Sequence, residues 1–340
     1  MAPIRVGVIG TGLIWIRTHR PLLATLRDVF QPVAFCDVSA ERRAAVAHDF
    51  PDAQVVSDYQ SLLQIPEIET VMIFTPIALN APIAMAALQA GKNVIMEKPI
   101  ARSTVEGRAL VDMAMQHQRR LFVTEQMGYR KAEEQLAEVI NSGEIGDLVM
   151  WERVAHGDLD TAPPPIRYET TPWRKSADFP LGTLFDGGIH QIAGLTKVFG
   201  VPETVFATGR KLRPEYGEYD HVAMTFQYGN GAVGLLSHST YLPAVQNHFH
   251  VYGSRGVIAV ESNRLVVNKP DQPQRMIEQP VEQSYAAMWQ AFARAVRDDH
   301  PPYYTPERAL TDVAILEMVD RSIKKGTPQH VDVPQSVREV

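Results

Sequence analysis

Short apolar runs alternate with helical segments in the first third of the chain. The apolar, β-branched runs are residues 4–9, 33–38, 71–75, 93–97 and 121–124. Between them, residues 82–88 and 105–115 have apolar side chains at helical spacing, and Pro82 suits the first position of a helix. Continuous apolar strands that alternate with helices are typical of a parallel sheet covered on both faces. The pattern predicts a doubly wound α/β domain over residues 1–125.

After residue 125 the strands follow one another more closely. Strand-like runs occur at residues 149–154, 205–209, 222–227, 232–237 and 248–253. Helical patterns cover residues 130–141, 184–198 and 307–324. The Pro-rich segment 161–180 is too long for a simple connection, and such segments are usually binding elements or disordered. We predict a second, α+β domain over residues 126–340, built on a large, open and mostly antiparallel sheet.

Composition and charge favour a folded enzyme over a nucleic-acid or membrane protein. The chain has 340 residues, of which 45% are hydrophobic and 21% charged, enough for two cores. The net charge is −6 and no long run of Lys and Arg occurs, which argues against a DNA or RNA partner. No apolar stretch approaches the roughly 20 residues of a membrane span, and the N-terminus has no signal-peptide pattern. We expect a cytoplasmic location. The chain has one cysteine, Cys36, and we expect it to be buried in a strand.

A glycine-containing turn follows the first predicted strand. Its sequence is Gly10-Thr11-Gly12-Leu13-Ile14-Trp15, and a helical pattern comes next. The first glycine permits a tight turn, and the second lets a pyrophosphate approach the backbone amides at a helix N-terminus. Because Trp15 replaces the usual third glycine, either the turn is wider or the indole points elsewhere. The turn predicts a dinucleotide site, and a purely structural turn is the alternative.

Asp37, at the end of the second predicted strand, indicates which dinucleotide to expect. A carboxylate in this place can accept hydrogen bonds from the adenosine ribose diol and would repel a ribose 2′-phosphate. Arg42 and Arg43 lie nearby in sequence and could attract such a phosphate. We expect NAD, with NADP as the alternative.

Two groups of polar residues are candidates for the chemistry. Lys98 follows the strand at 93–97, where ligands of open α/β sheets gather, so its ammonium group could stabilise charge on a substrate oxygen. Asp186 and His190 are four residues apart, which places them on one face of a helix. The histidine could exchange a proton with an alcohol, and the aspartate could orient it. A surface lysine and a structural Asp–His pair are the alternatives.

Three motifs in this order resemble the glucose-fructose oxidoreductase/inositol dehydrogenase (Gfo/Idh/MocA) family. They are Gly10-Thr11-Gly12, Glu97-Lys98-Pro99 and the segment from Asp186 to His190. The resemblance covers nearly the whole chain and includes Thr75-Pro76, Glu125-Gln126, Trp173-Arg174 and the closing helix from Glu307. It implies a Rossmann domain and a C-terminal domain whose open sheet often mediates homodimers or homotetramers.

The resemblance also implies a reaction and its residues. Lys98, Asp186 and His190 would form the catalytic set, and the Lys98–Pro99 bond would be cis. The implied cofactor-binding residues are Gly10, Thr11, Gly12, Leu13, Ile14, Asp37, Thr75, Pro76, Asn80, Glu97, Lys98 and Gln126. The expected reaction is NAD(P)-dependent hydride transfer at a CH–OH or C=O group of a sugar, a sugar derivative or an inositol.

Some positions depart from the family pattern. Asn80 stands where many relatives have histidine, and Ala193 where an aspartate often follows the catalytic histidine. Leu181-Gly182-Thr183 stands where a double glycine is common. These positions bear on the substrate pocket, so the sequence predicts no particular sugar.

Other polar and aromatic residues suggest less specific roles. Trp173, Arg174 and Tyr168, in or beside the Pro-rich segment, could close over a polyhydroxylated ligand. His248 and His250 alternate on a strand and share a face, but no cysteine or carboxylate accompanies them at metal-ligand spacing. We therefore interpret both histidines as structural and expect no metal.

Two other functions could use the same fold. One is a nucleotide-binding sensor or regulatory protein without turnover, and the other an enzyme that uses a tightly bound dinucleotide for a transient oxidation. The presence of Lys98, Asp186 and His190 argues against the sensor, because a sensor needs no proton acceptor beside a nicotinamide.

Overall fold

The computed structural model describes residues 2–157, 171–175, 181–182, 184–213 and 217–333. The chain divides into two compact units, Met1–Gln126 with Tyr285–Leu310, and Met127–Ser284 with Thr311–Val340. The first unit thus contains a segment from late in the sequence, although the spacing of strands predicts one continuous domain up to residue 125.

The first unit is built on a parallel sheet of six strands. They are β1 (Ile4–Ile9), β2 (Phe30–Cys36), β3 (Gln54–Val56), β4 (Thr70–Ile73), β5 (Asn93–Glu97) and β6 (Leu121–Thr124). Their order is β3-β2-β1-β4-β5-β6, that of doubly wound dinucleotide-binding folds. The predicted doubly wound domain is confirmed, and its strand order reverses between β1 and β4, where such folds bind ligands.

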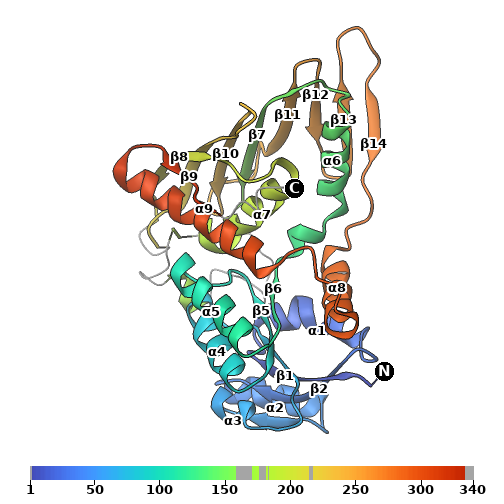
Figure 1. Cartoon of the computed structure of the whole chain (residues 1–340), viewed down its shortest axis with the longest axis vertical. Coiled ribbons are helices and arrows are strands. Elements are labelled where there is room, and N and C mark those ends of the chain that lie inside the picture. Colours follow the sequence, from blue (N-terminus) through green and yellow to red (C-terminus); the bar gives the residue numbers. More distant parts are fainter. Residues whose placement is uncertain (1, 158–170, 176–180, 183, 214–216, 334–340) are drawn as a thin grey trace. The chain divides into compact units, whose positions relative to one another are not determined.

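Helices cover both faces of this sheet. They are α1 (Arg20–Ala24), α2 (Ala40–Asp49), α3 (Tyr59–Leu63), α4 (Ile77–Gln89), α5 (Thr104–Gln116) and α8 (Ser284–Asp298). Helices α4 and α5 lie on one side of the sheet, and α1 and α8 on the other (Figure 1). Trp289 of α8 packs edge-on against Phe30 of β2, and Phe292 stacks on Phe122 of β6. These aromatic contacts attach α8 to strands that lie 170 or more residues earlier in the sequence.

Local sequence explains several helix boundaries. The hydroxyl groups of Ser39 and Ser103 accept hydrogen bonds from backbone amides in the first turns of α2 and α5. The expectation that Pro82 begins a helix is wrong, because α4 begins at Ile77, directly after Pro76, and Pro82 lies inside it. Pro82 is in the second turn, where it cannot donate the backbone hydrogen bond and its ring crowds the carbonyl group four residues earlier.

The second unit is built on a mixed sheet of nine strands. They are β7 (Leu148–His156), β8 (Thr204–Arg210), β9 (His221–Gln227), β10 (Val233–Ser239), β11 (His248–Gly253), β12 (Gly256–Val260), β13 (Arg264–Asn268), β14 (Arg275–Glu278) and β15 (Gln329–His330). The order is β14-β13-β12-β11-β7-β10-β9-β8-β15. Strands β7 and β10 pair in parallel, and the remaining neighbours in this sheet pair antiparallel. The predicted large, mostly antiparallel sheet is confirmed.

One face of the second sheet forms the core of this unit. Helices α6 (Lys131–Asn141), α7 (Ile189–Phe199) and α9 (Pro306–Lys325) accompany the sheet (Figure 1). The indole of Trp151 on β7 stacks on Phe199 and on Phe226, and it occupies the space that a side chain on Gly234 would need. Residues of β9 are alternately buried and partly exposed, as expected for a sheet with one covered face.

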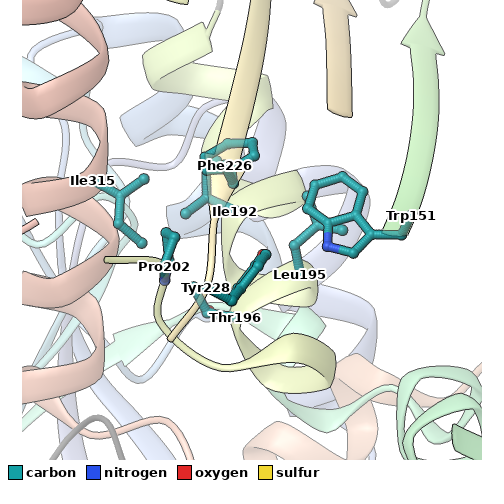
Figure 2. Close-up of a pocket in the computed structure, with 8 residues that line it drawn as sticks. All are labelled: Trp151, Ile192, Leu195, Thr196, Pro202, Phe226, Tyr228 and Ile315. Carbon is teal, nitrogen blue, oxygen red and sulfur yellow. The ribbon is translucent and has the colours of Figure 1, made fainter. Parts of the chain in front are cut away.

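A small pocket lies between this sheet and helices α7 and α9 (Figure 2). Its lining consists of Trp151, Ile192, Leu195, Thr196, Pro202, Phe226, Tyr228 and Ile315. Burial raises the pKa of the Tyr228 phenol far above its ordinary range, so this hydroxyl stays neutral. The nearly apolar lining indicates a packing gap rather than a reaction site.

None of the helices in the described part of the chain combines the length and the apolar character needed to cross a bilayer. Cys36 is buried at the end of β2, as predicted, and burial together with the charge of Asp37 raises the pKa of its thiol to about 11.

Candidate active site

The turn after β1 is shaped by its first glycine. Gly10 has a φ of +88°, and a Cβ atom there would lie 2.6 Å from the carbonyl oxygen of Phe74. Only glycine fits this position, because other residues would be both strained and in collision. Gly12 has more space, and a Cβ there would lie 3.4 Å from the guanidinium group of Arg42.

Trp15 does not disturb the turn, because its indole points into the core of the first unit. The side chain is 2% exposed and contacts the rings of Phe35, Phe50 and Phe74. The backbone from Trp15 to His19 forms a π-helical turn before α1 begins. Such turns are rare and frequently occur at functional sites, and this one places a large ring where a small residue is usual.

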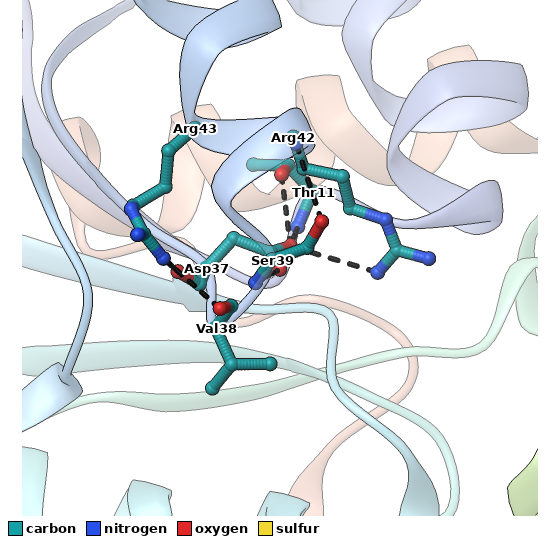
Figure 3. Close-up of polar contacts among 6 residues, drawn as sticks. All are labelled: Thr11, Asp37, Val38, Ser39, Arg42 and Arg43. Carbon is teal, nitrogen blue, oxygen red and sulfur yellow. Dashed lines mark hydrogen bonds and ion pairs between the residues drawn. The ribbon is translucent and has the colours of Figure 1, made fainter.

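The carboxylate of Asp37 organises the glycine turn (Figure 3). Its Oδ2 accepts hydrogen bonds from the backbone amide of Thr11 (2.8 Å) and from the Thr11 hydroxyl (2.9 Å). Its Oδ1 accepts one from the amide of Ser39 at 2.9 Å. The residue is 6% exposed. Asp37 therefore has a structural task in holding the turn, in addition to the cofactor contact predicted for it.

The two arginines beside Asp37 differ in their surroundings (Figure 3). Arg43 donates hydrogen bonds from Nη1 to the backbone carbonyl groups of Asp37 and Val38. Its guanidinium group is therefore bound to the protein backbone. The Arg42 side chain is 50% exposed, and its Nη1 lies 3.7 Å from Oδ2 of Asp37. Arg42 is thus the arginine available to a ligand at this strand end.

A chain of hydrogen bonds joins the ends of β4 and β5. The Thr75 hydroxyl donates to Oδ1 of Asn80 at 2.8 Å, and Nδ2 of Asn80 donates to the backbone carbonyl of Glu97 at 3.1 Å. Asn80 is fully buried. The Lys98–Pro99 bond that follows is cis, as the family resemblance implies. The predicted residues Thr75, Asn80 and Glu97 are therefore linked to one another directly beside Lys98.

The Glu97 carboxylate lies in a second, buried network. Its Oε1 accepts a hydrogen bond from the Thr124 hydroxyl at 2.6 Å and contacts Nε2 of His19 at 2.8 Å. Trp289 contacts Nδ1 of His19 through its Nε1 at 3.3 Å. Since an indole N–H can only donate, Nδ1 of His19 accepts and Nε2 carries the proton that is donated to Glu97. His19 is therefore fixed as a hydrogen-bond donor to Glu97, the residue that precedes Lys98.

The pKa of the Glu97 carboxyl shows which influence dominates. Burial raises it, but the hydrogen bond from His19, the charge of Lys98 and the hydrogen bond from the Thr124 hydroxyl lower it by more. The net pKa is below its ordinary value, so Glu97 is a carboxylate at neutral pH. A fixed negative charge therefore accompanies Lys98. Sequence reasoning missed His19 and Trp289, because only the packing of the π-helical turn before α1 and of α8 brings them to β5.

The second group of predicted residues lies in the second unit. Asp186 is in a π-helical turn, η6 (Leu184–Gly188), which continues directly into α7, where His190 lies in the first turn. Oδ2 of Asp186 accepts a hydrogen bond from Nε of Arg174 at 2.8 Å, and both side chains are nearly buried, at 14% and 11% exposed. The guanidinium group of Arg174 also lies 4.1 Å from the centre of the Trp173 ring. Arg174, predicted to contact the substrate, thus pairs with Asp186.

Helix α7 is anchored at its far end by a buried lysine. Nζ of Lys197 donates to the backbone carbonyl groups of Gly128 (2.8 Å) and Arg130 (3.2 Å) and to Oε1 of Glu134 (3.0 Å). Burial lowers the pKa of Lys197, and Glu134 partly offsets this. The anchor restrains the helix that carries His190.

The remaining predicted residues have the following places. Leu13 and Ile14 begin the helical segment after the glycine turn, and Pro76 precedes α4. Gln126 begins a 3-10 turn, η2 (Gln126–Tyr129), and its buried Oε1 accepts no hydrogen bond within the described part of the chain. Tyr168 lies outside the described residues.

Two family models match the sequence. Residues 4–125 match an oxidoreductase family with an NAD-binding Rossmann fold, and residues 134–259 match the GFO/IDH/MocA C-terminal domain. The chain belongs to the GFO/IDH/MocA oxidoreductase family. The predicted family, the class of enzyme and a nicotinamide dinucleotide as its cofactor are confirmed.

Individual members of the GFO/IDH/MocA family resemble the chain over most of its length. It is 26% identical to scyllo-inositol 2-dehydrogenase (NADP⁺) of Bacillus subtilis, a match over 95% of this chain and 94% of that protein. It is 30% identical to mouse trans-1,2-dihydrobenzene-1,2-diol dehydrogenase over 78% of both chains. The solved structure of an oxidoreductase from Thermotoga maritima superimposes with a TM-score of 0.89 at 27% identity, covering 97% of this chain and 98% of that one.

The residues of this GFO/IDH/MocA oxidoreductase fit a dinucleotide. The turn at Gly10 has no room for a side chain, Asp37 lies at the end of the neighbouring strand, and Gln126 has a buried acceptor without a partner in the described residues. These features follow the ends of β1, β2 and β6, and the strand order reverses between β1 and β4.

Proposed function

We propose that this oxidoreductase transfers a hydride between NAD(P) and a CH–OH or C=O carbon of a sugar, a sugar derivative or an inositol. The observation that carries the proposal is the position of Lys98, which directly follows β5 and lies between the ionised Glu97 and the cis peptide bond to Pro99. Two relatives are named for dehydrogenation of a cyclic polyol or diol, which supports a substrate with adjacent hydroxyl groups.

We assign roles to the residues by their chemistry. Lys98 donates a hydrogen bond to the reacting oxygen and stabilises its negative charge. His190 accepts the hydroxyl proton during oxidation and returns it during reduction. A bound nicotinamide supplies the hydride acceptor or donor. In this proposal the two side chains act on the same substrate carbon.

Arg174 is a positioning residue in this proposal. Its charge-assisted hydrogen bond to Oδ2 of Asp186 holds the carboxylate in one orientation at the start of the helix that carries His190. Trp173 lies over the guanidinium group and restrains it further. The substrate contacts predicted for Trp173, Arg174 and Tyr168 stay predictions.

A substrate screen tests the proposal. The purified chain is incubated with NAD or NADP and a panel of inositols, sugars and sugar acids, and the absorbance of the reduced nicotinamide is followed. We expect turnover on at least one polyol, a loss of roughly 100-fold or more in kcat for His190→Ala, and unchanged cofactor affinity. His48→Ala is the control, because the His48 side chain is 90% exposed in the first unit.

Two outcomes would replace the proposal. Cofactor binding without turnover on any polyol would favour a nucleotide-binding sensor. A dinucleotide that co-purifies and never exchanges would favour transient oxidation by a tightly bound cofactor. The homodimer or homotetramer and the cytoplasmic location expected from the sequence stay predictions.

A further inference from the structure

Three side chains that can serve as metal ligands lie close together on the second sheet, and none of them belongs to the residues proposed for catalysis. Glu152 lies on β7, and His248 and His250 lie on β11, which pairs antiparallel with β7. In the register His250 stands opposite Glu152, so their side chains are on the same face, and His248 shares that face two residues earlier. The sequence gives the histidines no nearby carboxylate, but strand pairing provides one from almost 100 residues away.

We propose that Glu152, His248 and His250 bind a divalent transition-metal ion of the zinc type. Oε1 of Glu152 lies 3.8 Å from Nε2 of His248 and 3.5 Å from Nδ1 of His250. One ligand atom from each residue lies within 4.8 Å of the other two. Tetrahedral zinc with bonds of about 2.0–2.2 Å holds its ligand atoms roughly 3.3–3.5 Å apart. Small side-chain rotations therefore suffice to form three bonds to one ion.

The hydrogen bond made by His248 selects the tautomer that metal binding needs. Nδ1 of His248 lies 3.2 Å from the backbone carbonyl oxygen of Gln246. Because a carbonyl can only accept, Nδ1 carries the proton, and in the neutral ring Nε2 has the lone pair. Nε2 is the atom that faces Glu152. Metal-bound histidines commonly donate their other N–H to a carbonyl or carboxylate in this way.

The carboxylate is also held from outside the cluster. The Tyr252 hydroxyl donates to Oε1 of Glu152 at 2.6 Å, which orients the carboxylate and lowers the pKa of Glu152. The neighbouring strands place Leu235 of β10 opposite Glu152 and Ala259 of β12 opposite His250. Apolar side chains thus flank the cluster in register, and the charged ligand of the set is a single carboxylate.

In the single chain, the cluster is accessible to an ion from solvent. The side chains of His248 and His250 are each 36% exposed, and that of Glu152 is 33% exposed. Two imidazole nitrogens and one carboxylate oxygen suit Zn²⁺, Co²⁺ or Ni²⁺, whereas Mg²⁺ and Ca²⁺ prefer oxygen ligands. A bound ion would join β7 to β11 and have one further coordination position for water.

Zinc titration of the full chain tests the site. After treatment with a chelator, the protein is titrated with ZnCl₂ by calorimetry near pH 7.5. We expect one Zn²⁺ per chain with a dissociation constant in the micromolar range or tighter. His250→Ala and His248→Ala should each weaken binding at least tenfold, and Tyr252→Phe should weaken it roughly 10-fold because the carboxylate loses its support. His48→Ala should bind as the wild type does.

A second measurement separates loss of the site from loss of folding. The melting temperature of each chelator-treated variant is compared with that of wild type, and we expect close agreement because the side chains are partly exposed. Added Zn²⁺ should raise the melting temperature of wild type and not that of the double variant His248→Ala/His250→Ala. The proposal is overturned if wild type binds no Zn²⁺ in this range, or if the double variant binds it equally tightly. Neither zinc binding nor the melting temperature depends on dehydrogenase activity, so these measurements test the metal site separately from the proposed function.

Discussion

Two buried carboxylates at strand ends of the first unit have different tasks. Asp37 accepts hydrogen bonds mainly from the backbone amides and hydroxyl of its neighbours, and it shapes the glycine turn. Glu97 accepts its hydrogen bonds from the side chains of His19 and Thr124, and its charge accompanies Lys98. The first therefore shapes the turn for which a dinucleotide site is proposed, and the second sets the electrostatics beside the proposed catalytic lysine.

Substitution of Glu97 by glutamine should make stability less sensitive to acid. The pKa of Glu97 is lower in the folded chain than its ordinary value, so its stabilising effect is fully present above the unfolded pKa and is lost as the pH falls through the folded one. Glu97→Gln should therefore lower the free energy of unfolding most at pH 7, and the difference from wild type should shrink below about pH 4. Urea unfolding at several pH values measures this. A difference that stays constant down to pH 3 would contradict the ionised network.

Arg42 should influence the choice between NADP and NAD. Its half-exposed guanidinium group lies beside Asp37, where a ribose 2′-phosphate would be placed. Arg42→Ala should raise the dissociation constant for NADP by roughly tenfold and change that for NAD by less than about threefold. Titration with both dinucleotides, with Arg27→Ala as an exposed control, measures the ratio. An unchanged ratio would show that Arg42 takes no part in this choice.

At the scale of elements, two π-helical turns position His19 and Asp186. One runs from Trp15 to His19 and directs the indole into the core while His19 reaches Glu97. The other, Leu184–Gly188, carries Asp186 into α7. The sequence pattern predicted helices in both regions but not the π turns. Over five residues, the spacing of apolar side chains in a π-helix cannot be told from that in an α-helix. The alternative that the indole of Trp15 points elsewhere, away from the turn, is confirmed.

The second sheet depends on a glycine beside the Trp151 indole. A methyl group on Gly234 of β10 would collide with the ring, which is fully buried and stacked between Phe199 and Phe226. Gly234→Ala should lower the free energy of unfolding by about 1–3 kcal/mol through overpacking. Gly157→Ala is the matched control, because no described residue lies within 4 Å of a Cβ there. Equal denaturation midpoints for both variants would show that the ring moves aside freely.

At the scale of the whole molecule, local patterns predicted the elements better than their partners. The predicted bounds of β1, β5, β6 and β11 match the structure, because each is a compact apolar run or an alternating one between turn residues. The sequence did not indicate that α8 packs in the first unit, or that His19 meets Glu97. Glu152 likewise meets His248 and His250 only through strand pairing. These contacts join residues about 80 to 270 positions apart, and periodicity within a short window contains no information about them.

The central claim is that Lys98 and His190 act on one substrate carbon, and a double-mutant cycle tests it most directly. The quantity measured is kcat/KM for wild type, Lys98→Met, His190→Ala and the double variant, on the polyol found in the screen, with dinucleotide affinity determined for each. When two residues act together in one step, the effects of replacing them on kcat/KM are strongly non-additive. The kcat/KM of the double variant should therefore be little lower than that of the less active single variant. Losses that multiply, or wild-type activity in either single variant, would contradict the account.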